Sequence, residues 1–112
     1  MGIELELHSQ RPSTRSWKSS RATLLRGSYD HGYDLADALA TLRETDPGKL
    51  PWIDPCGNTQ FNEQEAEAAR HEIPALLAKC TTPEQSAAVR DLDNLLRDCA
   101  HTPGSYLWFV GD

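Results

Sequence analysis

Residues 50–62 read LPWIDPCGNTQFN, and this stretch carries three successive signals that direct the backbone. Its centre, Asp-Pro-Cys-Gly at residues 54–57, has the composition of a type I turn. Asp bonds the following amides, Pro holds φ near −65° and Gly tolerates a positive φ. The flanking runs 52–53 and 59–61 have β character. We therefore predict a β-hairpin with a bulge at Gly57.

Asn62 ends this stretch and is predicted to cap a helix. Its side chain can accept a hydrogen bond from the amide of Gln64 or Glu65, and the Glu65 side chain can reach back to the Asn62 amide. The helix contains Pro74, which removes a backbone donor and clashes with the preceding turn, so a kink or break is expected there. Its apolar stripe comprises Ala66, Ala69, Ile73, Leu76, Leu77 and Cys80.

Strands are predicted near both ends of the chain. Residues 3–7 alternate Ile and Leu with Glu, which is the period-two pattern of a strand with one buried face. Residues 106–110 are aromatic or branched on both faces, which predicts a central strand beside the first. Residues 22–26 are compatible with either a strand or a helix, and we favour a short strand that pairs back on the first and ends at Gly27.

Two further helices complete the predicted fold. Apolar side chains recur at helical spacing over residues 34–44, and Thr82-Pro83 is a start signal for a helix that extends to about His101. The predicted fold class is therefore α+β: a small, mostly antiparallel sheet packed by three to four helices, of which the two longest form an antiparallel pair.

Length and charge describe one acidic domain with a basic arm. A chain of 112 residues predicts a single domain, residues 1–112. The net charge of −6 is uneven: residues 1–28 carry five basic and two acidic side chains, a net +3, and the remainder carries −9. Residues 9–20 are polar, Ser-rich and basic, and we predict a loop or arm there.

The start of the sequence has neither the apolar run nor the basic flank of a signal peptide. The longest apolar run, residues 106–110, is far short of the ~20 residues that span a bilayer. Three cysteines are an odd number with no close pair, which argues against a disulfide framework. These features predict a cytoplasmic protein with no membrane partner.

The sequence contains no recognisable metal or nucleophile motif. Cys99-x-His101 is the closest Cys and His pair, and neither Cys-x-x-Cys nor His-Glu-x-x-His occurs. Cys56 could act as a nucleophile with His31 or His71 as base, but a Cys in the third turn position needs no such role. The glycines form no cluster that would cradle a phosphate. We predict no metal, no cofactor and no catalytic residue, which favours a non-enzymatic protein.

Nucleic acid was weighed as a partner of the N-terminal arm. Trp17 would stack on bases there, and five basic side chains would contact phosphates: Arg11, Arg15, Lys18, Arg21 and Arg26. The pI near 5.1 argues against this function, because most of the surface would repel phosphate. We therefore predict that the arm lies on the acidic body.

Acidic side chains on the predicted helices could instead present a negative face to a basic protein, although solvated helix surfaces explain the same residues. Trp52 is either a lid on the core or an exposed interface anchor. The predicted partner-binding residues are Trp52, Glu63, Glu67, Asp91 and Asp98. The alternative is a ligand-binding or enzymatic pocket at the polar corner formed by Asp54, Asn58, Thr59 and Asn62.

Residues 54–62, DPCGNTQFN, and the closing residues 106–112, YLWFVGD, resemble a loose group of small uncharacterised bacterial proteins, common in actinobacteria. That group has an Asp-Pro-aromatic-Gly-x-Thr-x-Phe-Asn segment and a closing Val-Gly-Asp. The resemblance covers the second half of the chain and departs at Cys56, which replaces the aromatic residue. It implies a bacterial, cytoplasmic origin and a common fold, and it implies no activity. It also suggests that the polar corner and Gly111-Asp112 meet in space.

The sequence therefore predicts a small acidic interaction protein whose partner is a basic protein. An immunity protein or inhibitor directed against a basic toxin or nuclease is the sharpest version of this hypothesis. Small size, acidity and the lack of a catalytic constellation support it.

Overall fold

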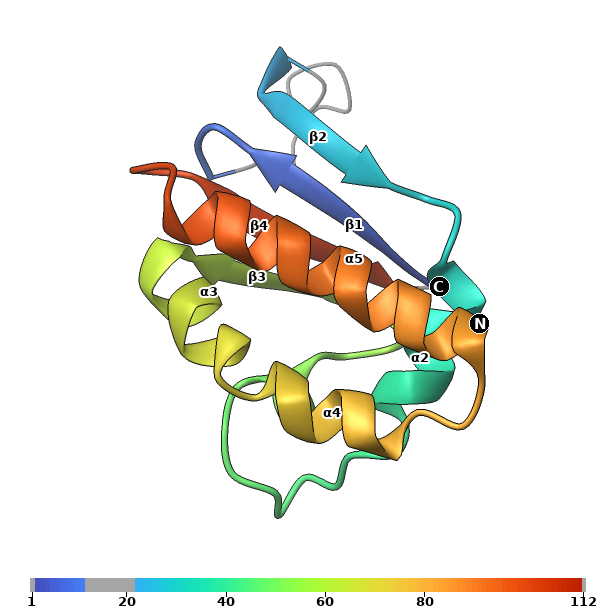
Figure 1. Cartoon of the computed structure of the whole chain (residues 1–112). Helices are drawn as coiled ribbons and strands as arrows, with labels where there is room; N and C mark the ends of the chain where they lie inside the picture. Colours follow the sequence, from blue (N-terminus) through green and yellow to red (C-terminus); the bar gives the residue numbers. More distant parts are fainter. Residues whose placement is uncertain (1, 12–21, 112) are drawn as a thin grey trace.

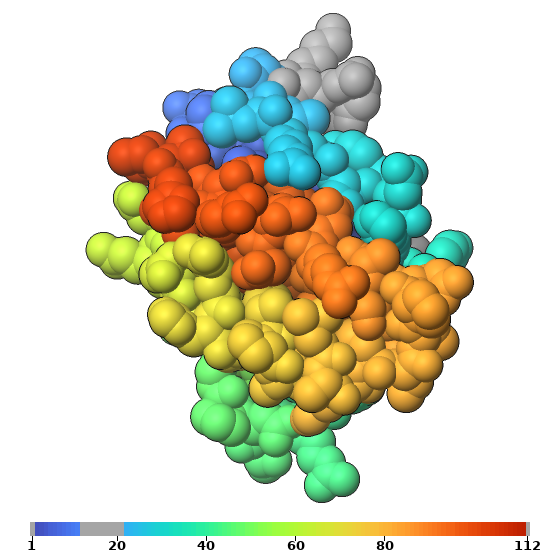
Figure 2. All heavy atoms as spheres, viewed as in Figure 1, coloured from blue at the N-terminus to red at the C-terminus, as the bar shows by residue number. Residues whose placement is uncertain are grey.

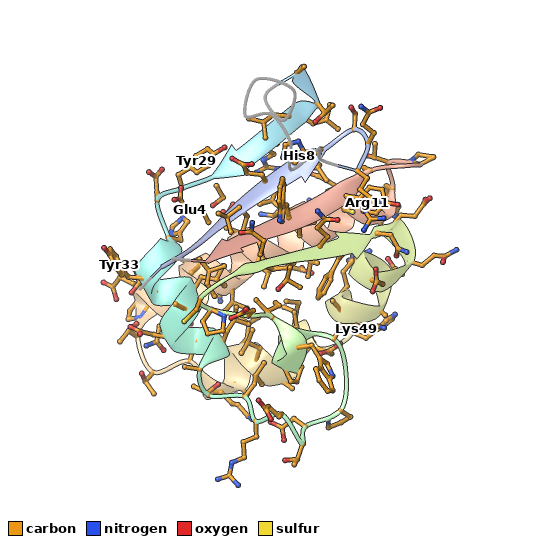
Figure 3. The ribbon with its side chains drawn as sticks, turned by 180° about the vertical axis from the view of Figure 1, so that it is seen from behind. Glu4, His8, Arg11, Tyr29, Tyr33 and Lys49 are labelled. Atoms are coloured by element: carbon orange, nitrogen blue, oxygen red, sulfur yellow. The ribbon has the colours of Figure 1, made fainter. Side chains whose placement is uncertain are left out.

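The structure, a computed structural model, describes residues 2–11 and 22–111 of the chain. Within these residues a four-stranded antiparallel sheet has the strand order β2-β1-β4-β3. Its strands are β1 (Ile3–His8), β2 (Leu24–Ser28), β3 (Asn58–Asn62) and β4 (Tyr106–Gly111). The helices lie on one face of the sheet (Figure 1). In the view from the other side, the opposite face of the sheet is turned toward the reader (Figure 3).

Four α-helices and one short 3₁₀ helix accompany this sheet in the described part of the chain. They are α2 (Gly32–Leu39), η1 (Leu50–Trp52), α3 (Glu63–Arg70), α4 (Ile73–Lys79) and α5 (Pro83–Ala100). The pair α3 and α4 runs one way and α5 returns in the opposite direction across the sheet (Figure 1). The predicted α+β class, with a small antiparallel sheet packed by helices, is confirmed.

The two faces of the sheet differ because side chains alternate along each strand. Leu7 lies opposite Leu107, which lies opposite Phe61, and this row is buried beneath the helices. Glu6 lies opposite Trp108 in the next row, which faces away from the helices. The core joins the inner sheet face to the apolar sides of all four helices; its helical members include Leu35, Ala66, Ala69, Leu76, Leu92, Leu95 and Leu96.

The helix starts predicted at Asn62 and Thr82 are confirmed, whereas the helix predicted from residue 34 begins at Gly32. The amide of Glu65 donates to Asn62 Oδ1 at 2.8 Å and the amide of Asn62 donates to Glu65 Oε1 at 3.1 Å, which completes the capping box. Thr82 caps α5 by accepting from the Gln85 amide at 3.1 Å. The helix after Asn62 breaks between α3 and α4, just before Pro74, which occupies the first turn of α4.

The predicted hairpin is wrong. Trp52 belongs to η1, and β3 pairs with β4 along its whole length. A turn is present, because the Cys56 amide donates to Asp54 Oδ1 at 2.9 Å and the Gly57 amide to the Asp54 carbonyl at 3.4 Å. Gly57 has no positive φ; a Cβ there would lie 2.5 Å from Asp54 Oδ2. Glycine at this position leaves room for the Asp54 carboxylate in its present position, and it forms no bulge.

Two predicted boundaries also differ. The helix predicted at 34–44 is α2, which ends at Leu39, and the Thr41 hydroxyl donates to the Ala38 carbonyl at 2.7 Å, a bond that competes with further helix. Gly27 lies inside β2, where a Cβ would meet the ring of Tyr29 at 2.4 Å. The strand continues through Gly27 because this residue pairs with Glu6 of β1, and the missing side chain leaves room for the ring.

The basic arm predicted at residues 9–20 lies outside the described residues from position 12 onward, as do Trp17 and the basic side chains Arg15, Lys18 and Arg21. Across residues 2–11 and 22–111, none of the helices is both long enough and apolar enough to traverse a lipid bilayer.

Candidate functional site

The connection from β2 into α2 carries an acidic surface with two exposed aromatic rings. Tyr33 is 70% exposed and Tyr29 is 48% exposed. Tyr33 and Asp37 are one helical turn apart and share a face of α2. Glu4 of β1, Tyr29 and Tyr33 lie on the same side of the molecule (Figure 3). We call this region the Tyr/Asp surface and define it as Glu4, Tyr29, Asp30, Tyr33, Asp34 and Asp37.

Local packing positions this surface. The Tyr29 hydroxyl donates to Glu6 Oε2 at 2.9 Å, and its ring lies over Gly27 of β2. The start of α2 approaches β1 closely, since a Cβ on Gly32 would lie 3.6 Å from the backbone of Ile3. Both contacts tie the connection to the sheet, so one of the two rings is held in place by the fold.

A cavity of about 400 Å³ opens between these elements. It is lined by Gly2, Glu4, Tyr29, Asp30, Gly32 and Tyr33. Two tyrosines and two carboxylates therefore line it, and none of the six residues is a lysine or an arginine. Such a lining suits a cation that carries an apolar or planar portion.

The carboxylates of the Tyr/Asp surface have no side-chain partner among the residues that the structure describes. In residues 2–11 and 22–111, no side-chain hydrogen bond or ion pair involves Glu4, Asp30, Asp34 or Asp37. Among the described residues, a partner can therefore pair with these four charges without breaking an existing side-chain contact. The charges also attract cations at a distance.

The acids predicted to bind a partner each have a hydrogen bond or an ion pair within the molecule. Arg26 Nη1 donates to Asp98 Oδ2 at 2.7 Å, and Asp91 lies 4.0 Å from Arg26 Nη2 while its other oxygen accepts from the Ser28 hydroxyl. Glu67 pairs with Arg70 at 3.1 Å. Glu63 accepts from the Gly104 amide at 3.3 Å. The structure thus joins Asp91 and Asp98 through one arginine and places the two glutamates elsewhere.

Trp52 lies at the end of η1 and is 69% exposed, so it is not a lid on the core. Its segment lies away from the Tyr/Asp surface. In Figure 3, Lys49, at the start of η1, is across the molecule from Tyr33. In Figure 2 the green segment containing η1 projects at the bottom, whereas the turquoise segment of α2 lies at the upper right. Trp52 and the Tyr/Asp surface are therefore separate features.

The polar corner proposed as an alternative pocket supports the backbone. Thr59 Oγ1 accepts from the Asp54 amide at 3.0 Å, the Asp54 carboxylate holds the following turn, and Asn62 caps α3. Asn58 is exposed at the start of β3. None of these four residues lines the 400 Å³ cavity.

The polar corner and the end of β4 do meet, as the resemblance suggested for Gly111. The Gly111 amide donates to the Gly57 carbonyl at 2.7 Å, and a Cβ on Gly111 would lie 2.5 Å from the Pro55 carbonyl oxygen. The close approach of two backbones therefore requires glycine at position 111. Asp112 lies outside the described residues.

A second polar cluster lies on the sheet face away from the helices. His8 is 1% exposed; its Nδ1 is 2.8 Å from Thr23 Oγ1 and its Nε2 is 3.1 Å from Glu6 Oε1. Its ring meets Trp108 edge-on with centroids 5.8 Å apart. Hydroxyl, imidazole and carboxylate follow the order of a nucleophile, a base and its orienting acid. The ring is buried, however, so a substrate cannot reach it. The hydrogen bond between His8 and Thr23 instead joins β1 to the residues before β2.

The cysteines differ in environment. Cys99 is buried, and burial raises the pKa of its thiol, which therefore stays neutral and unreactive. Cys56 is exposed at the turn, and its thiol makes no hydrogen bond to a described histidine. Among the described residues no group of three His, Cys, Asp or Glu side chains is arranged to hold a metal ion.

In the region of the Tyr/Asp surface, the sequence pattern predicted only a helix over residues 34–44, and it did not single out the surface itself. A compositional signal was present: residues 29–37 contain two tyrosines and three aspartates and no lysine or arginine. Comparison with protein-family models, with curated proteins and with solved structures found no match to the chain. Function is therefore inferred from the residues of the surface.

Proposed function

We propose that this chain is a small, cytoplasmic interaction protein that binds a basic protein through the Tyr/Asp surface. The observation that carries this proposal is a set of four carboxylates that have no side-chain partner within residues 2–11 and 22–111 and that lie beside two exposed tyrosines. Tyrosine is enriched at protein interfaces because its ring is large and amphipathic. Unpaired carboxylates add the charge complementarity that selects a basic partner and speeds encounter.

Inhibition is the sharpest form of this function. An immunity protein against a basic toxin or nuclease needs to cover a positively charged site with a small acidic domain, and the net charge of −6 on 112 residues fits that role. A standard interface buries about 800 Å² on each partner. The total accessible surface is 6511 Å², so one side of the molecule supplies such an area.

No second function is proposed for the polar corner. The hydrogen bonds of Asp54, Thr59 and Asn62 are those of a turn and a helix cap, which accounts for these side chains without a ligand.

Affinity capture from the organism that encodes the chain tests the proposal. A tagged protein is used as bait at physiological salt, and any captured protein is produced separately and titrated back by calorimetry at several salt concentrations. We expect one basic protein, bound at one-to-one stoichiometry, with an affinity that falls as salt increases. For the inhibitor form, the bait also suppresses the activity of the captured protein.

Recovery of the bait alone would count against the proposal, as would a partner whose affinity does not change with salt. A partner that still binds after the Tyr/Asp surface has been reversed in charge would also contradict it.

A further inference from the structure

We infer that the cavity between Glu4, Tyr29 and Tyr33 receives an arginine side chain of the basic partner. This inference rests on the proposed function and names the group that the Tyr/Asp surface recognises. It concerns only the 400 Å³ cavity, whereas the proposed function concerns the whole surface.

The aromatic lining favours a planar cation. A guanidinium group stacks on tyrosine faces through cation–π and dispersion contacts. Tyr29 is already held by its bond to Glu6, so stacking on it costs little additional side-chain entropy. Tyr33 is 70% exposed and presents its ring to an incoming group.

The carboxylates supply directional acceptors. Glu4 projects from the sheet face that points away from the helices. On this face it lies opposite Val110 of β4, which in turn lies opposite Asn58 of β3. Neither neighbour is cationic, and Glu4 has no side-chain partner in the described part of the chain. A carboxylate in this state accepts two parallel bonds from a guanidinium, a geometry that the ammonium of lysine cannot match.

The size of the cavity accommodates a long side chain. Pockets for small molecules span roughly 300–1,000 Å³, and this cavity of about 400 Å³ is near the lower end. One arginine side chain fits this size, whereas a helix or strand of the partner does not. The backbones of Gly2 and Gly32 form part of the lining, so no side chain from these positions fills the space.

Nuclear magnetic resonance titration with blocked tripeptides tests the inference. The probes are Ac-Gly-Arg-Gly-NH₂, the corresponding lysine peptide, and the citrulline peptide, which has the shape of arginine without its charge. We expect the arginine peptide to shift the amides of residues 30–34 and the ring signals of Tyr29 and Tyr33, with a Kd of about 1 mM. The lysine peptide should bind about fivefold more weakly, and the citrulline peptide should cause no saturable shift.

Two cavity variants and one control locate the binding. Glu4→Gln and Tyr33→Ala should each weaken the arginine peptide by about fivefold or more. Glu84→Gln removes an exposed charge at the start of α5 and should leave the titration unchanged. All three positions lie outside the core, so an unaltered spectrum confirms that each variant is folded.

Equal shifts from the arginine, lysine and citrulline peptides would overturn the inference. Unchanged binding in both cavity variants would do the same. The proposed function fails separately. Asp34→Lys/Asp37→Lys could abolish partner capture while Glu4→Gln/Tyr33→Ala does not. That result would support the proposed function of the Tyr/Asp surface and contradict the inference about the cavity. If the arginine peptide binds the cavity but no partner is captured, the proposed function fails although the cavity recognises arginine.

Discussion

Asp91 and Asp98 on α5 hold Arg26 of β2, whereas Asp34 and Asp37 on α2 hold no side chain within the described chain. All four are negative charges on helices, and composition does not distinguish them. In the first region the charges join a helix to the edge strand of the sheet. In the second region they face solvent beside two exposed tyrosines. Availability for a partner therefore depends on internal pairing, and not on the number of acidic residues.

Reversing the free charges should have the largest effect. Asp34→Lys/Asp37→Lys is expected to weaken binding of the basic partner by about 100-fold, because like charges then face each other across the interface. Its free energy of unfolding should fall by no more than about 1 kcal/mol, the cost of a lysine in the first turn of α2. Calorimetric titration and urea unfolding measure the two quantities.

Glu67→Lys/Asp98→Lys is the matched control, because it changes the net charge by the same amount. It breaks the ion pairs with Arg70 and Arg26 but leaves the Tyr/Asp surface intact. We expect binding within about threefold of wild type, in line with a rim or distant charge. Equal losses of affinity in the two double variants would show that overall charge, and not the surface, controls binding.

Removing a paired carboxylate should lower stability more than removing a free one. Asp91→Ala leaves the Ser28 hydroxyl and one side of Arg26 without an acceptor, and we expect a loss of about 1.5–2 kcal/mol in the free energy of unfolding. Asp37→Ala should change it by less than about 0.5 kcal/mol. Urea unfolding of both variants makes the comparison; similar values would mean that the contacts of Asp91 contribute little.

Asp46 offers the smallest and most specific test of a paired carboxylate. Its pKa lies below its ordinary value of 3.8, chiefly because it accepts from the Arg43 amide at 2.9 Å and secondarily because Lys79 is nearby. A depressed pKa stabilises the fold above the unfolded-state pKa, and this contribution is lost as the pH falls through the folded-state pKa. Wild type should therefore exceed Asp46→Asn in stability at neutral pH, and the difference should shrink in acid. A difference that stays constant during an acid titration of thermal unfolding would contradict this.

Local signals in the sequence predicted much of the fold. The capping box at Asn62 and Glu65 and the Thr82 cap depend on residues within one helical turn, so their hydrogen bonds could be anticipated from spacing. The alternation in β1 and the apolar character of β4 predicted their places in the sheet. The two caps were confirmed because residues within one helical turn decide them, whereas the pairing of β1 with β4 joins segments that are far apart in the sequence.

The hairpin was predicted wrongly for the opposite reason. Residues 59–61 had β character and a turn before them, but β4 offers a longer and more apolar partner than residues 52–53. Position 57 likewise suggested a bulge, whereas the approach of the Asp54 carboxylate explains its glycine. Competition between distant segments decides strand pairing, and no local pattern contains that comparison.

The candidate site shows the same division. Sequence alone determined that the chain is acidic, that tyrosines and aspartates are concentrated between residues 29 and 37, and that the main helices and strands begin near their capping and alternating residues. Only the tertiary structure decided which carboxylates are free. Arg26 neutralises Asp98 because β2 lies beside α5, and Glu4 joins Tyr33 because α2 begins against β1. Charge is a property of a residue, but its availability is a property of the fold, since ion pairs form between segments that meet only in space.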